Sequence, residues 1–164
     1  MLKYFRTSLV AAACWMDIGT AHANQLVEGR AKIALINGTP AICLPKDAPR
    51  SFAVSSVLLM ESQSFPPGMW SIRLKEGARP IRLGPGQCFP YGSVPEGYQL
   101  EPRGVNSRPL RLETDNGYYF RISRAGRLWS ISQIGYYSAD FCIKEAASGS
   151  VKVRNISLCA DAGR

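Results

Sequence analysis

The sequence predicts an all-β domain, an antiparallel β-sandwich of immunoglobulin-like or related type that is stabilised by disulfides. Three observations support this prediction. Short apolar runs rich in β-branched and aromatic residues recur at regular intervals, turn residues separate them, and no segment keeps a period of 3.6 residues over three helical turns. Many short strands with turns between them are typical of sandwiches and related antiparallel folds.

The first expected strands flank a strong turn signal. Residues 32–36 lead into Asn37-Gly38, a dipeptide that favours the two-residue turn of a β-hairpin, and residues 41–44 follow it. Residues 52–60 are a largely apolar run that we predict as a strand, although this run is the one segment that is also compatible with a helix. The other expected strands are residues 69–75, 81–83, 110–113, 118–123, 129–131, 136–144 and 151–158.

Aromatic side chains mark one face of several expected strands. Trp70, Tyr118, Phe120 and Trp129 take part in patterns with a period of two, which is the period of a half-buried strand. We predict that they pack in the core rather than stack on a ligand. Residues 93–108, rich in Pro, Gly and Arg, are expected to form a long loop.

The N-terminal residues have the order of a secretory signal. Lys3 and Arg6 give a short positive region, an apolar stretch spans residues 8–16, and the triplet Ala21-His22-Ala23 provides a cleavage site. The apolar stretch is far shorter than the roughly 20 residues of a membrane-spanning helix. We therefore predict a signal peptide at 1–23, a single domain at 24–164, export to the periplasm of a Gram-negative bacterium and no transmembrane span.

A second interpretation of the same segment is lipidation at Cys14. Val10-Ala11-Ala12-Ala13-Cys14 resembles a bacterial lipoprotein box, in which the cysteine becomes the lipidated N-terminus. Ala11 stands where a larger aliphatic residue is usual, and the apolar run before Cys14 is very short. Cleavage after Ala23 is therefore the favoured interpretation, and Cys14 is then an apolar residue of the signal.

The mature chain is basic. The whole chain carries 20 Lys and Arg against 12 Asp and Glu, and the predicted signal holds Lys3, Arg6 and Asp17, so the net charge falls from +8 to +7. The basic residues are spread singly along the chain, without the runs or motifs of nucleic-acid binders. We favour an acidic protein as the partner over a role of the positive charge in solubility alone, and we expect no nucleic acid.

Four cysteines remain after removal of the signal, and an even number in an exported protein predicts two disulfides. They are Cys43, Cys88, Cys142 and Cys159. Neither the C-x-x-C redox spacing nor a cluster of zinc ligands occurs among them. Three pairings are open. Cys43 and Cys142 both lie inside expected apolar strands, where they can bridge two packed sheets, so we predict Cys43–Cys142 and Cys88–Cys159.

The only histidine, His22, lies in the predicted signal. The mature chain therefore lacks the base of Ser-His and Cys-His catalysis and any histidine ligand for a metal. Acidic residues sit singly, mostly near Gly, Pro or Ser, and nothing in the pattern points to a pair of catalytic carboxylates. We predict that the protein is not an enzyme and uses no metal and no other cofactor.

Three pieces, taken in order, resemble one known family. They are an Asn-Gly turn before a strand with a cysteine, INGTPAICLP at 36–45; the element GQCFPYG at 86–92; and an aromatic strand with Phe-Cys, YYSADFCIK at 136–144. With the export signal, they resemble the type VI secretion immunity periplasmic proteins, many of which are lipoproteins. The poor lipid box and the additional Cys159 depart from that pattern. The resemblance implies a periplasmic protein that binds and neutralises a type VI secretion effector toxin without catalysis.

Three functions stay open at the level of the sequence. The first is the toxin-neutralising binder, in which arginines of the 93–108 segment, such as Arg103 and Arg108, contact the toxin. The alternative is a structural or assembly-accessory interaction module of the cell envelope. The third is a periplasmic hydrolase, which requires two carboxylates brought together in a cleft.

Overall fold

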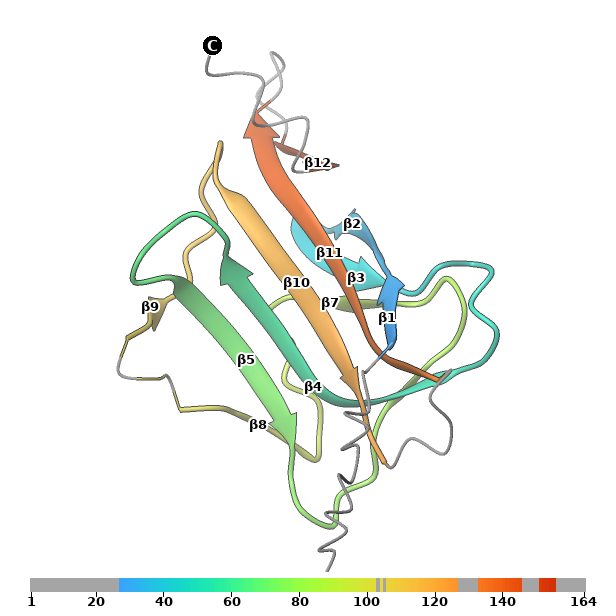
Figure 1. Ribbon diagram of the computed structural model, residues 1–164. Coiled ribbons are helices and arrows are strands. Elements are labelled where there is room, and N and C mark those ends of the chain that lie inside the picture. Colours follow the sequence, from blue (N-terminus) through green and yellow to red (C-terminus); the bar gives the residue numbers. More distant parts are fainter. Residues whose placement is uncertain (1–26, 103, 105, 127–132, 146–150, 156–164) are drawn as a thin grey trace, which may run out of the picture.

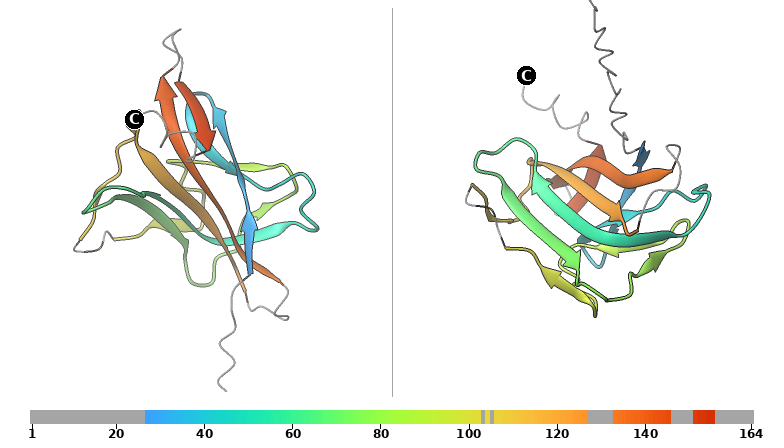
Figure 2. Two further views of the ribbon diagram at one scale, coloured as in Figure 1. Left: turned by 45° about the horizontal axis from the view of Figure 1, so that its top comes forward. Right: turned by 60° about the horizontal axis from the view of Figure 1, so that its bottom comes forward.

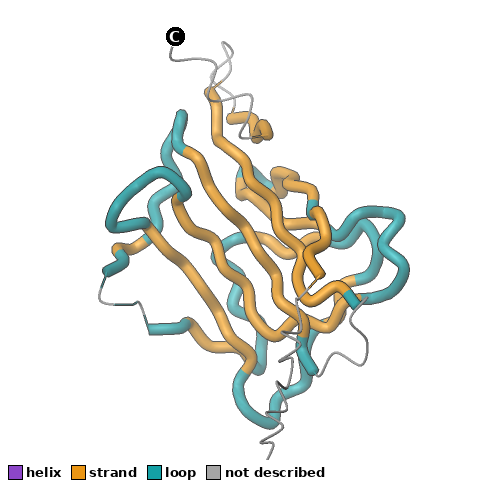
Figure 3. Tube along the Cα trace, viewed as in Figure 1, coloured by secondary structure: helices purple, strands orange, loops and turns teal. Residues whose placement is uncertain are grey.

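The computed structural model describes residues 27–102, 104, 106–126, 133–145 and 151–155. This part of the chain consists of strands, turns and loops (Figures 1 and 3), and it contains no helix that could cross a membrane. The predicted signal peptide with Cys14, the expected strand 129–131, Arg103 and Cys159 lie outside the described residues. The strands are β1 (Val27–Arg30), β2 (Lys32–Ile36), β3 (Thr39–Cys43), β4 (Phe52–Glu61), β5 (Gly68–Leu74), β6 (Arg82–Leu83), β7 (Cys88–Pro90), β8 (Tyr98–Leu100), β9 (Arg108–Pro109), β10 (Gly117–Arg124), β11 (Ile134–Glu145) and β12 (Val151–Asn155).

The strands form a large and a small sheet. The large sheet has the order β1-β11-β10-β4-β5-β8, with β12 paired to β11, β6 to β4 and β9 to β5. The small sheet has the order β2-β3-β7. The small sheet packs on the part of the large sheet that contains β10, β11 and β12, as a second layer (Figures 1 and 2).

One apolar core fills the space between the two sheets. Ile42 and Phe89 of the small sheet share a cluster of buried residues with Phe120, Ile122 and Phe141 of the large sheet. The two sheets therefore form a sandwich, and the predicted all-β fold class is confirmed. Two pairings at the edges of the large sheet, β1 with β11 and β5 with β9, are parallel, in contrast to its antiparallel centre of β4, β5, β10 and β11.

The Asn-Gly signal forms the expected hairpin between β2 and β3. Ile36 and Thr39 are register partners on either side of the turn, and both central residues have positive φ, 51° at Asn37 and 78° at Gly38. Positive φ at both positions is the requirement of a type I′ turn, which Asn and Gly meet at little cost. Residues 52–61 are a strand, as predicted, rather than a helix.

The predicted core aromatics differ in burial. Tyr118 and Phe120 are fully buried at 0% exposure, so the prediction is confirmed for both. Trp70 is partly buried and packs against the core cluster, with its indole ring 5.2 Å from the Tyr91 ring in an edge-on contact. Trp129 lies outside the described residues.

The prediction of a strand at residues 110–113 is wrong, and the segment 93–108, expected from the sequence to be a loop, contains the short strands β8 and β9. Leu110 is buried and Leu112 packs on the core, but residues 110–113 pair with no described strand. The alternation of apolar and charged residues indicates which side chains are buried, and a loop that crosses the core can show the same alternation as a strand. The short strands β8 and β9 both pair with β5. Segments of two or three residues are too short to show a period.

The predicted cysteine pairing is also wrong, because Cys43 forms a disulfide with Cys88. The two residues are register partners on the neighbouring strands β3 and β7, with their Cα atoms 3.9 Å apart. Cys142 lies on β11 of the large sheet, and it is disulfide-bonded to a partner outside the described residues. The Cys43–Cys88 bridge therefore holds β3 and β7 of the small sheet together instead of linking the two sheets.

The two edges of the large sheet share one construction. On the outer edge of β11, β1 pairs as far as Ser138 and β12 pairs from Phe141 onward. On the outer edge of β5, β9 pairs with residues 68–69 and β8 with residues 72–74. Each edge thus has one parallel and one antiparallel partner, with two residues between them in the described structure. A concavity opens at each of these interruptions.

Candidate functional site

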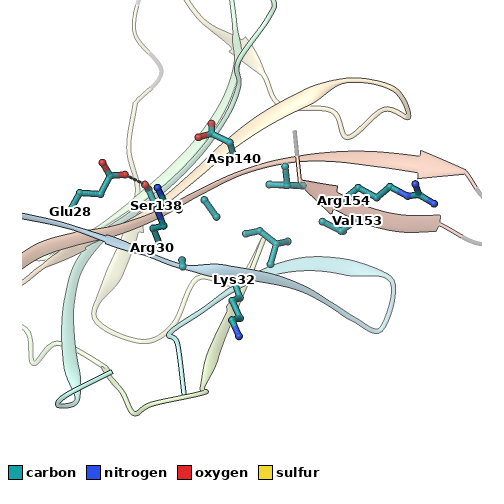
Figure 4. Close-up of a pocket in the computed structure, with 11 residues that line it drawn as sticks. Glu28, Arg30, Lys32, Ser138, Asp140, Val153 and Arg154 are labelled. Atoms are coloured by element: carbon teal, nitrogen blue, oxygen red, sulfur yellow. Dashed lines mark hydrogen bonds between the residues drawn. The ribbon is translucent and has the colours of Figure 1, made fainter. Parts of the chain in front are cut away.

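The larger concavity is a groove at the β11 edge, which we call the basic groove. It has a volume of about 770 Å³ and lies between β1 and β2 on one side and β11 and β12 on the other (Figure 4). It is placed where the chain leaves the large sheet at Arg30 and enters the small sheet at Lys32. Its lining residues are Glu28, Arg30, Ala31, Lys32, Ile33, Ser138, Ala139, Asp140, Phe141, Val153 and Arg154.

Apolar side chains form part of the lining of this groove. Ala31, Ile33 and Val153 are partly buried and pack against the core, and Phe141 is 1% exposed. The backbone N–H of Ala31 donates to the carbonyl oxygen of Ser138 at 2.8 Å, which fixes the crossing chain against β11. The lining is therefore held by the core, and the groove is a preformed feature of the fold.

Three cations line the groove, Arg30, Lys32 and Arg154. All three residues are exposed, and none of them forms an ion pair within the described part of the chain. Lys32 projects to the side of β11 opposite Asp140, and Arg154 lies at the β12 end of the groove (Figure 4). Unpaired guanidinium and ammonium groups around an apolar lining are suited to carboxylates on a partner, because charge-assisted hydrogen bonds are stronger than neutral ones.

Two carboxylates stand on the outer side of β11. Glu28 and Asp140 project to the same side in Figure 4, and Glu28 Oε1 accepts a hydrogen bond from Ser138 Oγ. Tyr136 Oη donates to Glu28 Oε2 at 3.4 Å. Burial and the neighbouring charge of Glu28 raise the pKa of Asp140 above its ordinary value of 3.8. Glu28 is thus held by two hydroxyl groups, whereas Asp140 holds its proton more tightly than an ordinary aspartic acid does.

Arg121 completes the polar surface next to the groove. It is the register partner of Ser138 on β10, and its guanidinium carbon lies 5.6 Å from the centroid of the Tyr136 ring. Its Nε is buried and has no hydrogen-bond partner among the described residues. Tyr136, Ser138 and Arg121 therefore lie together beside the groove, on the face of the large sheet that is turned away from the small sheet.

The sequence-predicted site residues lie elsewhere or are otherwise engaged. Arg108 does not stand free on a loop, since its Nη2 lies 2.6 Å from Oε2 of the buried Glu61. Arg103 and the proposed lipidation site Cys14 lie outside the described residues. Within the described residues no three His, Cys, Asp or Glu side chains gather as a metal site. The structure does not test the prediction that the protein uses no cofactor.

Sequence reasoning missed the groove residues. Arg30 ends β1, Lys32 begins β2, and Arg154 lies far along the chain on β12. Glu28 and Asp140 stand singly in the sequence, and the fold brings both to the lining of one groove. No local pattern marked them, because single basic residues are spread along the whole chain. Only the pairing of β1 and β12 with the same edge of β11 brings them together.

Comparisons with known proteins are negative at three levels. No protein-family model matches the chain, no curated protein matches it, and no solved structure matches it. The fold and the groove by themselves define a class: an all-β, disulfide-containing sandwich with an open basic groove at one sheet edge.

Proposed function

We propose that this protein is a periplasmic immunity protein, which binds an acidic surface of a type VI secretion effector toxin in the basic groove and neutralises the toxin without catalysis. The observation that carries the proposal is a set of three exposed cations, Arg30, Lys32 and Arg154, which form no ion pair within the described residues and lie beside partly buried apolar side chains. The toxin itself enters through the resemblance of the three sequence pieces at 36–45, 86–92 and 136–144 to that family.

The groove favours binding over a passive role in solubility. A solubilising charge needs no particular surroundings, and most surface cations of a basic protein serve that role. Here the three cations flank Ala31, Ile33 and Val153, apolar side chains at an opening of about 770 Å³. An interface gains affinity from buried apolar contacts and gains speed and specificity from complementary charge, and the groove offers both.

The location in the proposal rests on the predicted signal and on the disulfide. The Cys43–Cys88 bridge is compatible with an oxidising compartment, where such bonds form and persist. Residues 1–23 have the order of a signal with an A-x-A cleavage site. A toxin that acts in the periplasm or on the cell envelope is the target that a protein in this compartment can reach.

A protection assay tests the proposal. The effector encoded beside this gene is expressed in the periplasm of a sensitive host, with and without the full chain, and survival is counted. We expect protection that is lost when residues 1–23 are deleted. Unchanged killing with both proteins confirmed in the periplasm counts against this partner, and the absence of any effector gene nearby favours the envelope module.

Charge reversal assigns the binding to the groove. The variant Arg30→Glu, Lys32→Glu, Arg154→Glu is expected to weaken effector binding roughly tenfold or more. The matched control Lys46→Glu, Arg50→Glu, Arg79→Glu makes the same change in net charge at three other exposed cations that form no ion pair within the described residues. Equal weakening by both variants would mean that overall charge, rather than the groove, governs binding.

Asp140 separates neutralisation by binding from neutralisation by chemistry. Asp140 and Glu28 are the two acids of the groove, so a hydrolytic mechanism would use them. We expect Asp140→Asn to keep full protection and to bind an acidic partner at least as well, because it removes a repelling charge. Loss of protection with intact binding, or release of a cleaved product by the wild-type protein alone, would favour the hydrolase instead.

A further inference from the structure

The opposite edge of the large sheet holds a second concavity, which we call the aromatic pocket. It has a volume of about 480 Å³ and lies at the interruption between β8 and β9 on the edge of β5. Trp70 of β5 and Tyr91, which follows β7, approach each other edge-on with their ring centroids 5.2 Å apart. The lining residues are Met69, Trp70, Ser71, Tyr91, Leu100, Glu101, Pro102, Pro109 and Leu110.

The aromatic pocket has the composition of an anchor site. Seven of its nine lining residues are apolar or aromatic, and Trp and Tyr are the residue types that dominate the energetics of interfaces. Leu100 is 58% exposed, although it follows the buried Tyr98 by only two residues. An exposed large aliphatic side chain beside a half-buried tryptophan leaves apolar surface in water that a partner can cover.

The one charged lining residue of this pocket is the acidic Glu101, and cations outnumber acids among the described residues next to it. The two nearby acids are already paired inside the protein, Glu101 with Arg73 at 2.6 Å and Glu61 with Arg108 at 2.6 Å. Arg111, which directly follows Leu110, is exposed and forms no ion pair within the described residues. A segment that enters the pocket with carboxylates beside its apolar residue therefore meets a complementary surface.

We infer that the aromatic pocket is a second, separate docking site for the partner, and that it takes one apolar side chain flanked by acidic residues. The acidic character of that partner rests on the proposed function. The apolar side chain displaces water from the Trp70 and Tyr91 rings, and the flanking carboxylates lie near Arg111 and the exposed part of Arg73. A partner that reached both edges would span the large sheet and gain affinity by binding at two points.

A small probe tests the pocket without the effector. 3-Phenylpropionate combines an apolar ring with one carboxylate, and a ligand of this size is expected to bind with a Kd of roughly 1–10 mM. In ¹H–¹⁵N spectra of the full mature chain, its addition should shift the Trp70 indole N–H and the amides of Leu100 and Glu101. The amides of Ile33 and Ala139 in the basic groove should stay in place. No shift at Trp70, or larger shifts at the groove, would overturn the inference.

Two matched variants connect the pocket to the partner. Leu100→Asp places a charge at the pocket mouth, whereas Val94→Asp makes the same kind of change at a side chain that is 44% exposed and does not line the pocket. We expect Leu100→Asp to abolish probe binding and to weaken effector binding roughly 10- to 100-fold, and Val94→Asp to change neither.

The outcomes distinguish the two proposals. Unchanged effector affinity in Leu100→Asp, with tight binding by the wild type, overturns the docking site and leaves the immunity function standing. A wild type that binds the probe at Trp70 but does not bind the effector overturns the immunity function and upholds the pocket as a site for an apolar, carboxylate-bearing group.

Discussion

The guanidinium Nη2 of Arg108 lies 2.6 Å from Oε2 of Glu61, whose side chain has no exposed surface. The same carboxylate oxygen accepts a hydrogen bond from the backbone N–H of Gly68 at 3.1 Å. Glu61 ends β4, Gly68 begins β5 and Arg108 begins β9, so one buried carboxylate joins three strands beside the aromatic pocket. Its other oxygen, Oε1, has no hydrogen-bond partner among the described residues.

Removal of Arg108 should therefore cost more than removal of an ordinary surface arginine. Breaking a fully buried ion pair costs about 3–5 kcal/mol, and Arg108 is 39% exposed, so we expect Arg108→Ala to lower the free energy of unfolding by about 2–4 kcal/mol. Urea unfolding followed by tryptophan fluorescence measures the loss. Arg73→Ala is the control, because Arg73 is 66% exposed and its pair with Glu101 should be worth less than about 1 kcal/mol. Equal, small losses would show that Glu61 does not depend on Arg108.

The buried hydroxyl group of Tyr98 should make the folded protein less stable at alkaline pH. Its hydroxyl group donates to the Val54 carbonyl oxygen at 2.6 Å and accepts from the Ile81 N–H at 3.2 Å, and burial raises its pKa above 10.0. Because the folded state binds this proton more tightly than the unfolded state, the stabilisation is complete below pH 10.0 and is lost as the pH rises above it. Burial shifts the pKa of Tyr118 and Tyr137 in the same direction.

Tyr98→Phe should separate this contribution. It leaves a buried carbonyl group and N–H group without the hydroxyl partner, so we expect a loss of about 1–3 kcal/mol at neutral pH and a shallower decline above pH 10. Tyr119→Phe is the control at neutral pH, because the Tyr119 hydroxyl makes no hydrogen bond within the described residues. A wild-type unfolding free energy that stays constant from pH 9 to 11 would contradict the prediction.

Local signals made much of this fold predictable. Asn37-Gly38 specifies its turn through the backbone angles of two residues, and the alternation around Tyr118 and Phe120 specifies which face of β10 is buried. The short strand β8 escaped prediction because three residues show no period, and β9 with two residues escaped for the same reason. Their pairing with β5 depends on the whole fold. The prediction of a Cys43–Cys142 disulfide was wrong for the same reason. Cys88 lies on β7, a strand of three residues, and the sequence does not reveal that this strand pairs with β3.

The candidate site was less predictable than the fold. Net charge indicated an acidic partner, but it did not indicate where on the surface the charge would gather. Arg30 and Arg154 come from β1 and β12, near the two ends of the domain, and they line one groove because both strands pair with β11. A site assembled from distant strands has no local motif. The aromatic pocket was hidden for a further reason, since Trp70 serves both the core and the pocket lining.

The N-terminus of the mature protein is predicted to be Asn24. The prediction rests on the A-x-A site at residues 21–23 and on the poor match of Ala11 to a lipid box. The first described strand begins at Val27, so cleavage after Ala23 would leave β1 intact for its pairing with β11. Intact mass of the protein from a periplasmic extract measures the cleavage site. A mass that corresponds to a diacylated chain beginning at Cys14 would show lipidation instead.

The first disulfide should contribute strongly to stability. Cys43 and Cys88 are 45 residues apart in the chain, and the chain entropy removed from the unfolded state corresponds to about 4 kcal/mol. We expect Cys43→Ala, Cys88→Ala to lower the free energy of unfolding by about that amount, with β7 released first, since it pairs with β3 through only three residues. A loss below about 1 kcal/mol in urea unfolding would contradict this expectation.

The second disulfide is predicted to join Cys142 to Cys159. Cys43 and Cys88 are paired with each other, and cleavage after Ala23 removes Cys14, so Cys159 is the remaining cysteine of the mature chain that Cys142 can bond within the molecule. Cys142 is the register partner of Arg154 on β12, and Cys159 follows Arg154 by only five residues in the sequence, a length of chain that can bring it to Cys142.

A Cys142–Cys159 bridge would fasten the C-terminal segment to β11 beside the basic groove, so its reduction should weaken effector binding as well as stability. Non-reducing peptide mapping should recover a Cys142–Cys159 peptide that disappears in Cys159→Ser. A Cys142 peptide linked to Cys14, or to a second copy of the chain, would show that the signal is retained or that the bridge is intermolecular.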